Sequence, residues 1–398
     1  MSFEFKKNKY LNKNSIDNIN IFPFRPSSKF KISVVIPVYG EHKSLKETLL
    51  SLNKNSHEYL SQTVVIIVIN SPEINENIKY AQDNLKLLTE LSASTYLPQN
   101  NLNLFWIDAS STGNKLPGSG GVGMARKLGM DASLFFAEWG KEPIIISLDA
   151  DTLVMNNYLE SIFHFFQKFK YCAGSINFLH RQDQSDEINN AVKEYEGYLN
   201  SYVDGLKFAG SPYAFHTIGS AMTFRASSYI AAGGMKKLKG GEDFYFMQSL
   251  KKLGEIGVVD KTTVFPSARI SQRATFGTGI RISESLNGKS IKCYNPNVFV
   301  TLKTLLDTID NWIGFSESLS TFLNLKDSNP EVYLFFEKNN LTELWTKIYT
   351  NTISSKIELN SSQREKLKTA FHNWFDAFKT LKFIHFLENS YPEKYSKL

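Results

Sequence analysis

The sequence predicts an α/β protein with an open, mostly parallel sheet flanked by helices, followed by an all-helical C-terminal extension. Short β-branched and aliphatic runs alternate with amphipathic stretches through the first half of the chain, as they do in βαβ units. These runs are apolar throughout, which is typical of strands buried on both faces. From about residue 297 onward the apolar spacing is helical, as in "VFVTLKTLLDTIDNWIGF".

The first half supplies four predicted strands and the helices between them. Leu45, Leu49 and Leu52 recur at helical spacing in "EHKSLKETLLSL". The strands are "KISVVIPVYG" (31–40), "TVVIIVIN" (63–70), "NLFWID" (103–108) and "IIISLDAD" (144–151). The predicted helices cover 41–52, 74–91, about 120–139 and "TLVMNNYLESIFHFF" (152–166).

The middle of the chain is less regular. It predicts a helix at 186–206, a strand with a Gly-Ser break at 214–225, and a helix from Glu242 followed by another strand. Residues 266–296 are rich in Pro, Gly, Ser and Arg, which predicts a mobile loop.

We therefore divide the 398 residues into three parts. Residues 1–30 are polar and predict an irregular N-terminal arm, residues 31–295 form the α/β domain, and residues 296–398 form the helical extension. The aromatic faces of that extension leave three roles open: packing on the α/β domain, forming a homodimer, or resting on a membrane surface.

Composition excludes several classes of protein. The chain is 42% hydrophobic and 21% charged, which are globular values. Its net charge of +6 comes without an arginine-rich stripe, which argues against a nucleic-acid partner and leaves room for a small phosphorylated ligand or an anionic membrane surface. The two cysteines are not spaced for zinc, the N-terminus lacks a signal-peptide core, and no apolar run approaches a membrane span. We expect a cytoplasmic protein that contacts a membrane, if at all, peripherally from the inner face.

Two carboxylates, Asp149 and Asp151, stand where the fourth predicted strand ends. In an extended segment, residues i and i+2 point to the same side, and ligands of open parallel sheets bind outside the carboxyl ends of the strands. No basic residue is adjacent in sequence, so a hard divalent cation such as Mn²⁺ or Mg²⁺ would relieve the repulsion. The alternative is a pair that caps a turn or the following helix.

Four motifs give the chain a family resemblance. They are "ISVVIPVYGE" (32–41), "GVGMARKLGMD" (121–131), "IISLDAD" (145–151) and "GGEDFYFMQSLKKLG" (240–254). In this order and spacing, residues 31–275 resemble the family 2 glycosyltransferases of GT-A fold. The resemblance implies a nucleotide-sugar donor, a divalent metal on Asp149 and Asp151, and inverting transfer to a hydroxyl of a glycan, lipid-linked or small-molecule acceptor.

The same resemblance implies a nucleoside site beside the first two strands. Pro37, Tyr39 and Glu41 follow the first strand and would hold the nucleoside, or else form only a strand-terminating turn. Asn70 stands where the family generally carries an aspartate, which is a departure that bears on the identity of the base. Asp108 ends the third strand and either adds a carboxylate to the crevice or caps a turn.

Further residues are candidates for the donor diphosphate and sugar. Arg126 lies where a Gly-rich loop enters a helix, a setting suited to phosphate. Gly219 and Ser220 occupy the place where the family's sheet approaches the donor sugar, or form a strand bulge. Arg273, with Arg269 and Arg281, predicts a glycine-hinged lid whose arginines meet the diphosphate, or a solvated basic loop.

Glu242 and Asp243 open a helix after two glycines. Acidic residues complement a helix dipole there without any further role. The resemblance implies that Asp243 is the catalytic base for the acceptor hydroxyl and that Glu242 binds acceptor hydroxyls.

Two rival functions remain open. A sugar-phosphate nucleotidyltransferase also uses a Gly-rich loop and metal-binding carboxylates, but its Gly-Arg loop would follow the first strand, where this chain has "PVYGEHKS". A non-catalytic nucleotide- or glycan-binding relative is the second rival, because Asn70 departs from the family pattern.

Overall fold

The computed structural model describes residues 3–14, 28–118, 120–137, 142–182, 184–269, 277–312, 324–340, 343 and 360–398. The chain forms two compact units. Unit 1 comprises Met1–Lys193 and Phe215–Lys289, and unit 2 comprises Glu194–Ala214 and Ser290–Leu398. The predicted limits at 30 and 295 remain a prediction, and residues 194–214 belong to the helical unit.

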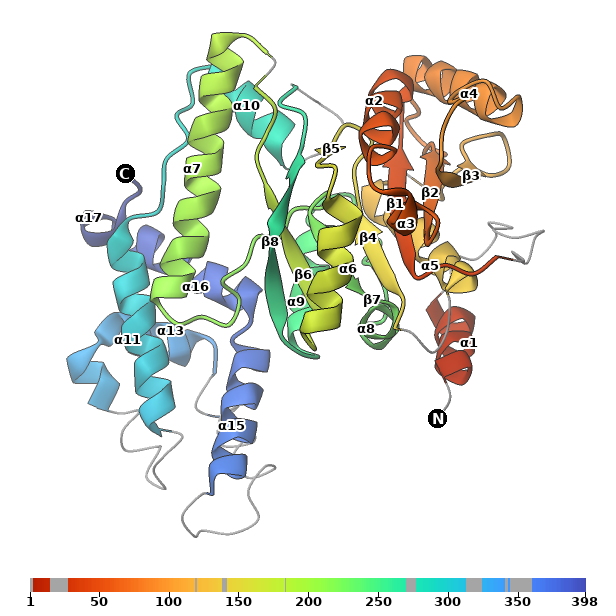
Figure 1. The fold of residues 1–398 in the computed structure, drawn as a ribbon. Helices are drawn as coiled ribbons and strands as arrows, with labels where there is room; N and C mark the ends of the chain where they lie inside the picture. The colour runs from red at the N-terminus through yellow and green to blue at the C-terminus, as the bar shows by residue number, and fades with distance from the viewer. Residues whose placement is uncertain are drawn as a thin grey trace. The chain divides into compact units, whose positions relative to one another are not determined.

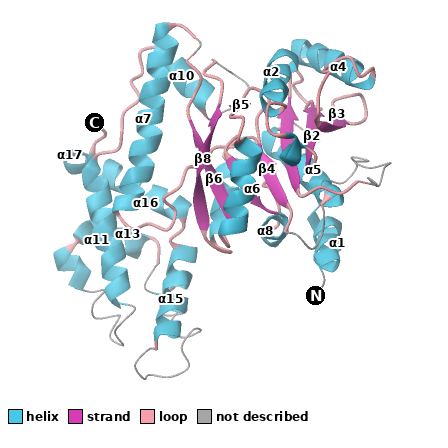
Figure 2. Ribbon diagram, viewed as in Figure 1, coloured by secondary structure: helices cyan, strands magenta, loops and turns pink. Residues whose placement is uncertain are grey.

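Unit 1 is built on one open sheet of eight strands in the order β3-β2-β1-β4-β7-β6-β8-β5 (Figures 1 and 2). The strands are β1 (Ile32–Val38), β2 (Thr63–Asn70), β3 (Asn103–Ala109), β4 (Ile144–Ser147), β5 (Leu153–Val154), β6 (Ala173–Phe178), β7 (Met222–Arg225) and β8 (Ile256–Phe265). Four of the seven pairings are parallel, and β7 and β5 run antiparallel to their neighbours. With helices on both faces and a helical C-terminal region, this confirms the predicted GT-A-like α/β fold class.

The helices of unit 1 cover the sheet according to the alternation of its side chains. In β1, Val34 and Ile36 point into a core shared with α2, α4 and α6, as alternation along a strand requires. On the other face α5 lies close to the sheet, because a Cβ at Gly129 would meet Val35 and Val68. The helices are α1 (Phe3–Asn14), α2 (His42–Leu52), α3 (His57–Leu60), α4 (Ile78–Ser92), α5 (Val122–Phe136), α6 (Tyr158–Lys168), α8 (Ala226–Ala231), α9 (Glu242–Lys251) and α10 (Thr278–Leu286).

Several local expectations were wrong. Residues Phe3–Asn14 form helix α1, where the sequence predicts an irregular arm. The segment predicted as one helix from 152 first forms strand β5, and α6 begins only at Tyr158. The predicted strand at 214–225 is limited to β7. Helix α10 lies within the predicted loop, and strand β6 was not predicted.

Helix α1 is held by a buried polar network rather than by an apolar stripe. The Tyr10 hydroxyl donates to Asp131 Oδ1 at 2.7 Å, and Tyr229 donates to the same oxygen at 2.6 Å. Lys127 Nζ donates to the Tyr10 hydroxyl at 2.7 Å and to Asp131 Oδ2 at 3.0 Å. All four side chains are buried, so each polar atom depends on the others for its partners.

Unit 2 is helical around an aromatic core. Its helices are the C-terminal part of α7 (Asp186–Phe208), α11 (Pro296–Trp312), α13 (Pro330–Lys338), α15 (Ser361–Trp374), α16 (Ala377–Ser390) and α17 (Pro392–Tyr395). Phe335, Phe371, Phe375 and Phe383 are buried together in this core. Within the described parts of the chain, no helix combines the length and the apolar composition that crossing a membrane requires.

Candidate active site at the carboxyl ends of β1 and β4

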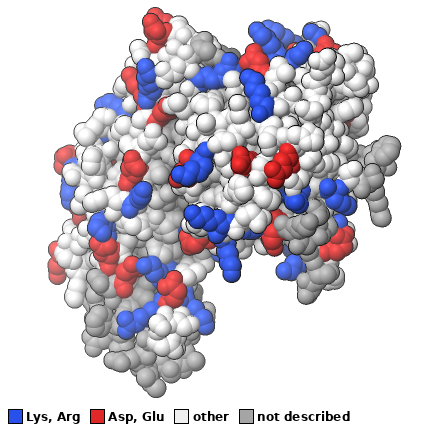
Figure 3. Space-filling view, viewed as in Figure 1, with Lys and Arg blue, Asp and Glu red and all other residues white. Residues whose placement is uncertain are grey.

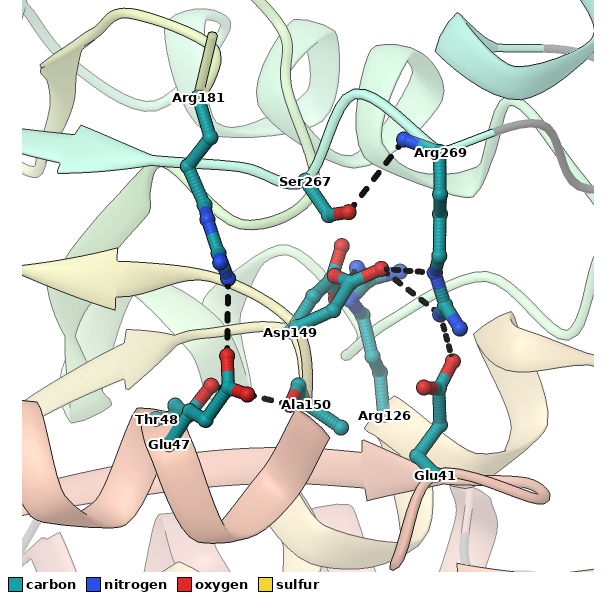
Figure 4. A network of polar contacts seen from close by, with 10 residues as sticks. Glu41, Glu47, Thr48, Arg126, Asp149, Ala150, Arg181, Ser267 and Arg269 are labelled. Atoms are coloured by element: carbon teal, nitrogen blue, oxygen red, sulfur yellow. Dashed lines mark hydrogen bonds and ion pairs between the residues drawn. The ribbon is translucent and has the colours of Figure 1, made fainter. Parts of the chain in front are cut away.

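The two aspartates lie on the loop that follows β4, at the carboxyl edge of the parallel part of the sheet. Strand β4 ends at Ser147 and runs parallel to β1, so both strands end at the same edge. The amide of Leu148 donates to the Val35 carbonyl at 3.0 Å. Thr48, on α2, donates to the carbonyl of Ala150 at 2.9 Å and fixes the loop between the aspartates (Figure 4).

Arg126, on α5, joins the first aspartate to the acidic start of α9. Its Nη2 donates to Asp149, its Nη1 donates to Glu242, and its Nε donates to Ser147 Oγ at 3.0 Å. Only 3% of the Arg126 side chain is exposed. Burial alone would lower the pKa of this guanidinium. Asp149 and Glu242 raise the pKa by more than burial lowers it, so Arg126 is held in its charged form.

Gly219 explains how the guanidinium of Arg126 fits. A Cβ at Gly219 would lie 2.8 Å from Cζ of Arg126, closer than side chains approach one another. The close approach expected at Gly219 is therefore made by Arg126. Ser220 beside it is buried, and the ordered strand begins only at Met222.

Arg269, just after β8, neutralises the second aspartate. Its Nε and Nη2 donate to Asp151 Oδ2 at 3.0 and 2.8 Å, and Nη2 also donates to Glu41 at the start of α2 (Figure 4). Burial lowers the pKa of Arg269, but Asp151 and Glu41 raise it more. The aspartates have no basic neighbour in sequence, but Arg126 and Arg269, from distant parts of the chain, reduce the repulsion between them.

Among the described residues that are joined by Arg126 and Arg269 or lie beside them, five carboxylates face these two guanidiniums. They belong to Glu41, Asp149, Asp151, Glu242 and Asp243. Burial raises the pKa of Asp149, and Asp151 raises it further against the opposing effect of Arg126. Burial and then Glu242 raise the pKa of Asp243 to about 7. Away from this edge, acidic and basic side chains are interspersed on the face shown in Figure 3.

The two aspartates fit a hard divalent cation that completes its coordination elsewhere. Each gives one oxygen to an arginine, and the other oxygens, Asp149 Oδ2 and Asp151 Oδ1, accept no hydrogen bond from the described residues. Their side chains are 36% and 22% exposed. The described residues contain no group of three or more His, Cys, Asp or Glu placed to hold a metal. Phosphate and water would therefore supply the remaining ligands, as is usual for Mg²⁺.

The residues expected to hold a nucleoside have identifiable local partners. Pro37 lies inside β1 rather than after it. The pairing of β1 with β4 ends at Val35 and Ser147, so at Pro37 strand β1 pairs with β2. The Tyr39 hydroxyl accepts from the Asn77 amide at 2.9 Å, and its ring packs edge-on against Tyr80.

Asn70 and Asp108 stabilise the ends of their own strands. Asn70 Nδ2 donates to the Val38 carbonyl at 2.9 Å and to the Val68 carbonyl at 3.3 Å, which an aspartate could not do. Asp108 Oδ1 accepts from the amides of Ser110 and Ser111 at 3.0 and 2.9 Å. Burial raises the pKa of Asp108, but these hydrogen bonds lower it more. Within the described residues, no hydrogen bond links Asp108 to Asp149 or Arg126.

Of the three arginines expected in a lid, Arg269 belongs to this group. Arg273 lies outside the described residues. Arg281, on α10, pairs with Glu284 at 3.0 Å. Thr48 was missed, although it interrupts the apolar face of α2 between Leu45 and Leu49, and a polar residue on such a face signals a specific partner.

No protein-family model matches the sequence, and no curated protein is similar to it at a significant level. Solved structures with a similar fold include S. aureus TarS 1–349 in complex with UDP-GlcNAc, at 15% identity and a TM-score of 0.43, covering 76% of this chain and 78% of that one. Mannosyltransferase PcManGT from Pyrobaculum calidifontis, in complex with GDP-Man and Mn²⁺, gives 12% identity and a TM-score of 0.40, covering 94% of each chain.

Proposed function

We propose that the protein is a family 2 glycosyltransferase that moves a sugar from a nucleoside-diphosphate donor to an acceptor hydroxyl with inversion, in glycan or polysaccharide synthesis. The observation that carries this proposal is the meeting of the aspartate pair after β4 with Asp243 at one edge of the sheet, around Arg126. The assignment to this family and to inversion rests on the four sequence motifs. A site of this kind needs metal-binding carboxylates for the donor and a separate base for the acceptor.

Asp243 is the base in this proposal. Its carboxylate takes the proton of the acceptor hydroxyl while the hydroxyl oxygen forms a bond to the anomeric carbon. The bond from that carbon to the diphosphate oxygen breaks on the opposite face, and the nucleoside diphosphate leaves with the bonding electron pair. A pKa raised to about 7 suits this role, because a base works best when its pKa is near the working pH.

We assign Glu242 a role other than the one that the resemblance implies. Its carboxylate is buried and bonded to Arg126, so we assign it to holding Arg126 rather than to binding acceptor hydroxyls. Arg126 has partners at all three nitrogens, and we therefore assign it to orienting Asp149 instead of contacting the diphosphate. Both residues act through their neighbours.

Asp149 and Asp151 would hold the divalent cation, Mn²⁺ or Mg²⁺. When bound, such an ion neutralises charge on the leaving diphosphate. Arg269 is 31% exposed and is placed to add a guanidinium to the same phosphates, which arginine recognises through paired hydrogen bonds. The nucleoside would lie beside the carboxyl ends of β1, β2 and β3, near Tyr39, Glu41, Asn70 and Asp108, with Pro37 close to the end of β1.

A thermal-shift panel of nucleoside diphosphates and nucleotide sugars, with and without Mn²⁺, tests the proposal on the full chain. We expect one base to give a Mn²⁺-dependent rise in melting temperature, and the matching sugar donor to be turned over. Asp149→Asn and Asp151→Asn should lose the Mn²⁺-dependent rise, whereas Asp243→Asn should keep it and lose turnover. Asp260→Asn, at an exposed position on β8, is the matched control. A Mn²⁺-dependent rise that survives in Asp151→Asn would remove the metal site.

A further inference from the structure

We propose that Arg269 takes the place of the cation on Asp151 when no metal is bound, so that the cation and the guanidinium exchange on this carboxylate. The inference deepens the proposed function and rests on it. The geometry that carries it is the contact of two Arg269 nitrogens with one oxygen of Asp151, together with the contact of the same guanidinium with Glu41 (Figure 4).

The exchange follows from charge. A divalent cation on Asp151 would lie close to the Arg269 guanidinium, and two positive charges at such short range repel strongly where the surroundings are partly buried. Arg269 holds Oδ2 of Asp151 and leaves Oδ1 open, so the cation and the guanidinium compete through this repulsion rather than for a single oxygen. Binding of the cation to the protein alone must therefore move Arg269 or compete with it.

The two arginines of the site are not equally able to move. Arg126 is almost completely buried, and its departure would leave Glu242 buried without its partner, which is strongly unfavourable. Arg269 is 31% exposed, so water can solvate its guanidinium if it leaves the carboxylate. Of these two guanidiniums, the one that can exchange is therefore Arg269 on Asp151.

Glu41 already pairs with Arg269 and can remain its partner after the guanidinium leaves Asp151. It accepts from Nη2 of Arg269 and is itself buried. When the contact with Asp151 opens, Arg269 can stay paired with Glu41 and turn its other nitrogens outward. A phosphate group next to the cation would then give those nitrogens new acceptors.

The exchange predicts coupled binding. Without a nucleotide, the cation competes with Arg269 and binds weakly. With a nucleoside diphosphate present, Arg269 gains a phosphate partner and its loss from Asp151 is offset. Metal and nucleotide should therefore strengthen each other's binding, and this coupling is reciprocal.

The test is direct measurement of Mn²⁺ binding to the full-length protein without nucleotide, from the loss of the free Mn²⁺ signal in electron paramagnetic resonance. Arg269→Gln should tighten the Mn²⁺ Kd by roughly tenfold, which corresponds to about 1.4 kcal/mol. Arg269→Lys, which keeps the charge but not the fork, should fall between it and the wild type. Arg181→Gln is the matched control, because Arg181 pairs with Glu47 on α2 rather than with Asp151.

A second measurement, of nucleotide affinity, should show the opposite effect of the same substitution. At saturating Mn²⁺, Arg269→Gln should bind UDP or GDP, whichever the wild type prefers, several-fold more weakly. Equal Mn²⁺ affinity in wild type and Arg269→Gln, or an equal gain in Arg181→Gln, would overturn the exchange and leave the proposed function standing. Failure of every variant to bind Mn²⁺, with nucleotide or without it, would overturn both. A melting curve for each variant shows whether it is folded. If Arg269→Gln does not fold, the comparison is made with Arg269→Lys.

Discussion

Arg126 and Asp149 form an ion pair in which the guanidinium is almost completely buried while the carboxylate remains partly open to solvent. The arginine comes from α5 and the aspartate from the loop after β4. The pair therefore fixes one oxygen of Asp149 from inside the protein and leaves the other facing outward. The same guanidinium also binds Glu242, so one buried cation orients residues from two separate elements.

Loss of Arg126 should destabilise the protein strongly. Arg126→Met leaves Glu242 buried without its charge partner, and breaking a buried pair in this way costs about 3–5 kcal/mol. Chemical denaturation of the full chain measures this. Adding Glu242→Gln to Arg126→Met should recover part of the loss, and Arg181→Gln should change the free energy of unfolding by less than about 1 kcal/mol. Equal changes in the free energy of unfolding for Arg126→Met and Arg181→Gln would contradict a structural role of the buried Arg126.

Turnover should depend on pH through Asp243. Its pKa is raised to about 7 by burial and by Glu242, and only the deprotonated carboxylate accepts a proton. With saturating substrates, kcat should therefore fall tenfold per pH unit well below pH 7 and level off above it. Asp243→Asn should lose turnover, and any rate still detected should lack this dependence on pH. An acid limb centred near pH 4 in the wild type would remove Asp243 as the base.

The same carboxyl group should make the protein less stable as the pH rises. Because burial raises the pKa of Asp243 above its usual value of 3.8 to about 7, the native state binds its proton more tightly than the unfolded state does. Stability from this group is therefore present below about pH 4 and is lost between pH 4 and 7, by about 1.4 kcal/mol for each pKa unit at most. Unfolding free energies of wild type and Asp243→Asn, compared at pH 4 and pH 8, should diverge in favour of the variant at pH 8. The reverse order would contradict the raised pKa.

Placing an aspartate at position 70 should destabilise the folded protein. Asn70 donates to the carbonyls of Val38 and Val68, whereas an aspartate would place an acceptor against them. Asn70→Asp should reduce the free energy of unfolding by roughly 1–3 kcal/mol. Asn101→Asp, at an exposed position, supplies the same chemical change as a control and should alter stability by less than about 0.5 kcal/mol. Equal results for the two variants would show that the amide contacts contribute nothing.

Removing one hydroxyl should loosen the N-terminal helix. Tyr10→Phe deletes the atom that accepts from Lys127 and donates to Asp131, and the buried charges lose a partner at a cost of roughly 1–3 kcal/mol. Hydrogen exchange of the α1 amides should speed up more than that of the β1 amides. Lys9→Gln, at an exposed position on the same helix, should leave both unchanged, and an equal acceleration there would contradict the role of the network.

The fold could be predicted where apolar patterning is strong. Strands β1 and β2 and helix α2 match their predicted ranges closely, because burial on a sheet requires continuous aliphatic runs and one-sided packing requires leucines at helical spacing. Strand β6 escaped prediction because its packing requires small residues: a Cβ at Gly174 would meet Val259 and Phe165. Helix α1 escaped because a polar network holds it rather than an apolar stripe.

The candidate site could be predicted only in part. The end of an apolar run located Asp149 and Asp151, and the glycines before α9 located Glu242 and Asp243. The pairings could not be read from the chain, because the two aspartates find their arginines 23 and 118 residues away. Sheet topology brings those partners together, and local patterning carries no information about it.

The fit of Gly219 against Arg126 has a consequence for how this sequence can diverge. Because there is no room for a side chain beside the guanidinium, the two positions are linked although Arg126 lies on α5 and Gly219 lies in the turn before β7. In distant homologues the two positions should covary. Where a shorter residue replaces the arginine, a residue larger than glycine can be accommodated at position 219. Such paired changes in an alignment would mark the proteins in which this buried cation has been given up.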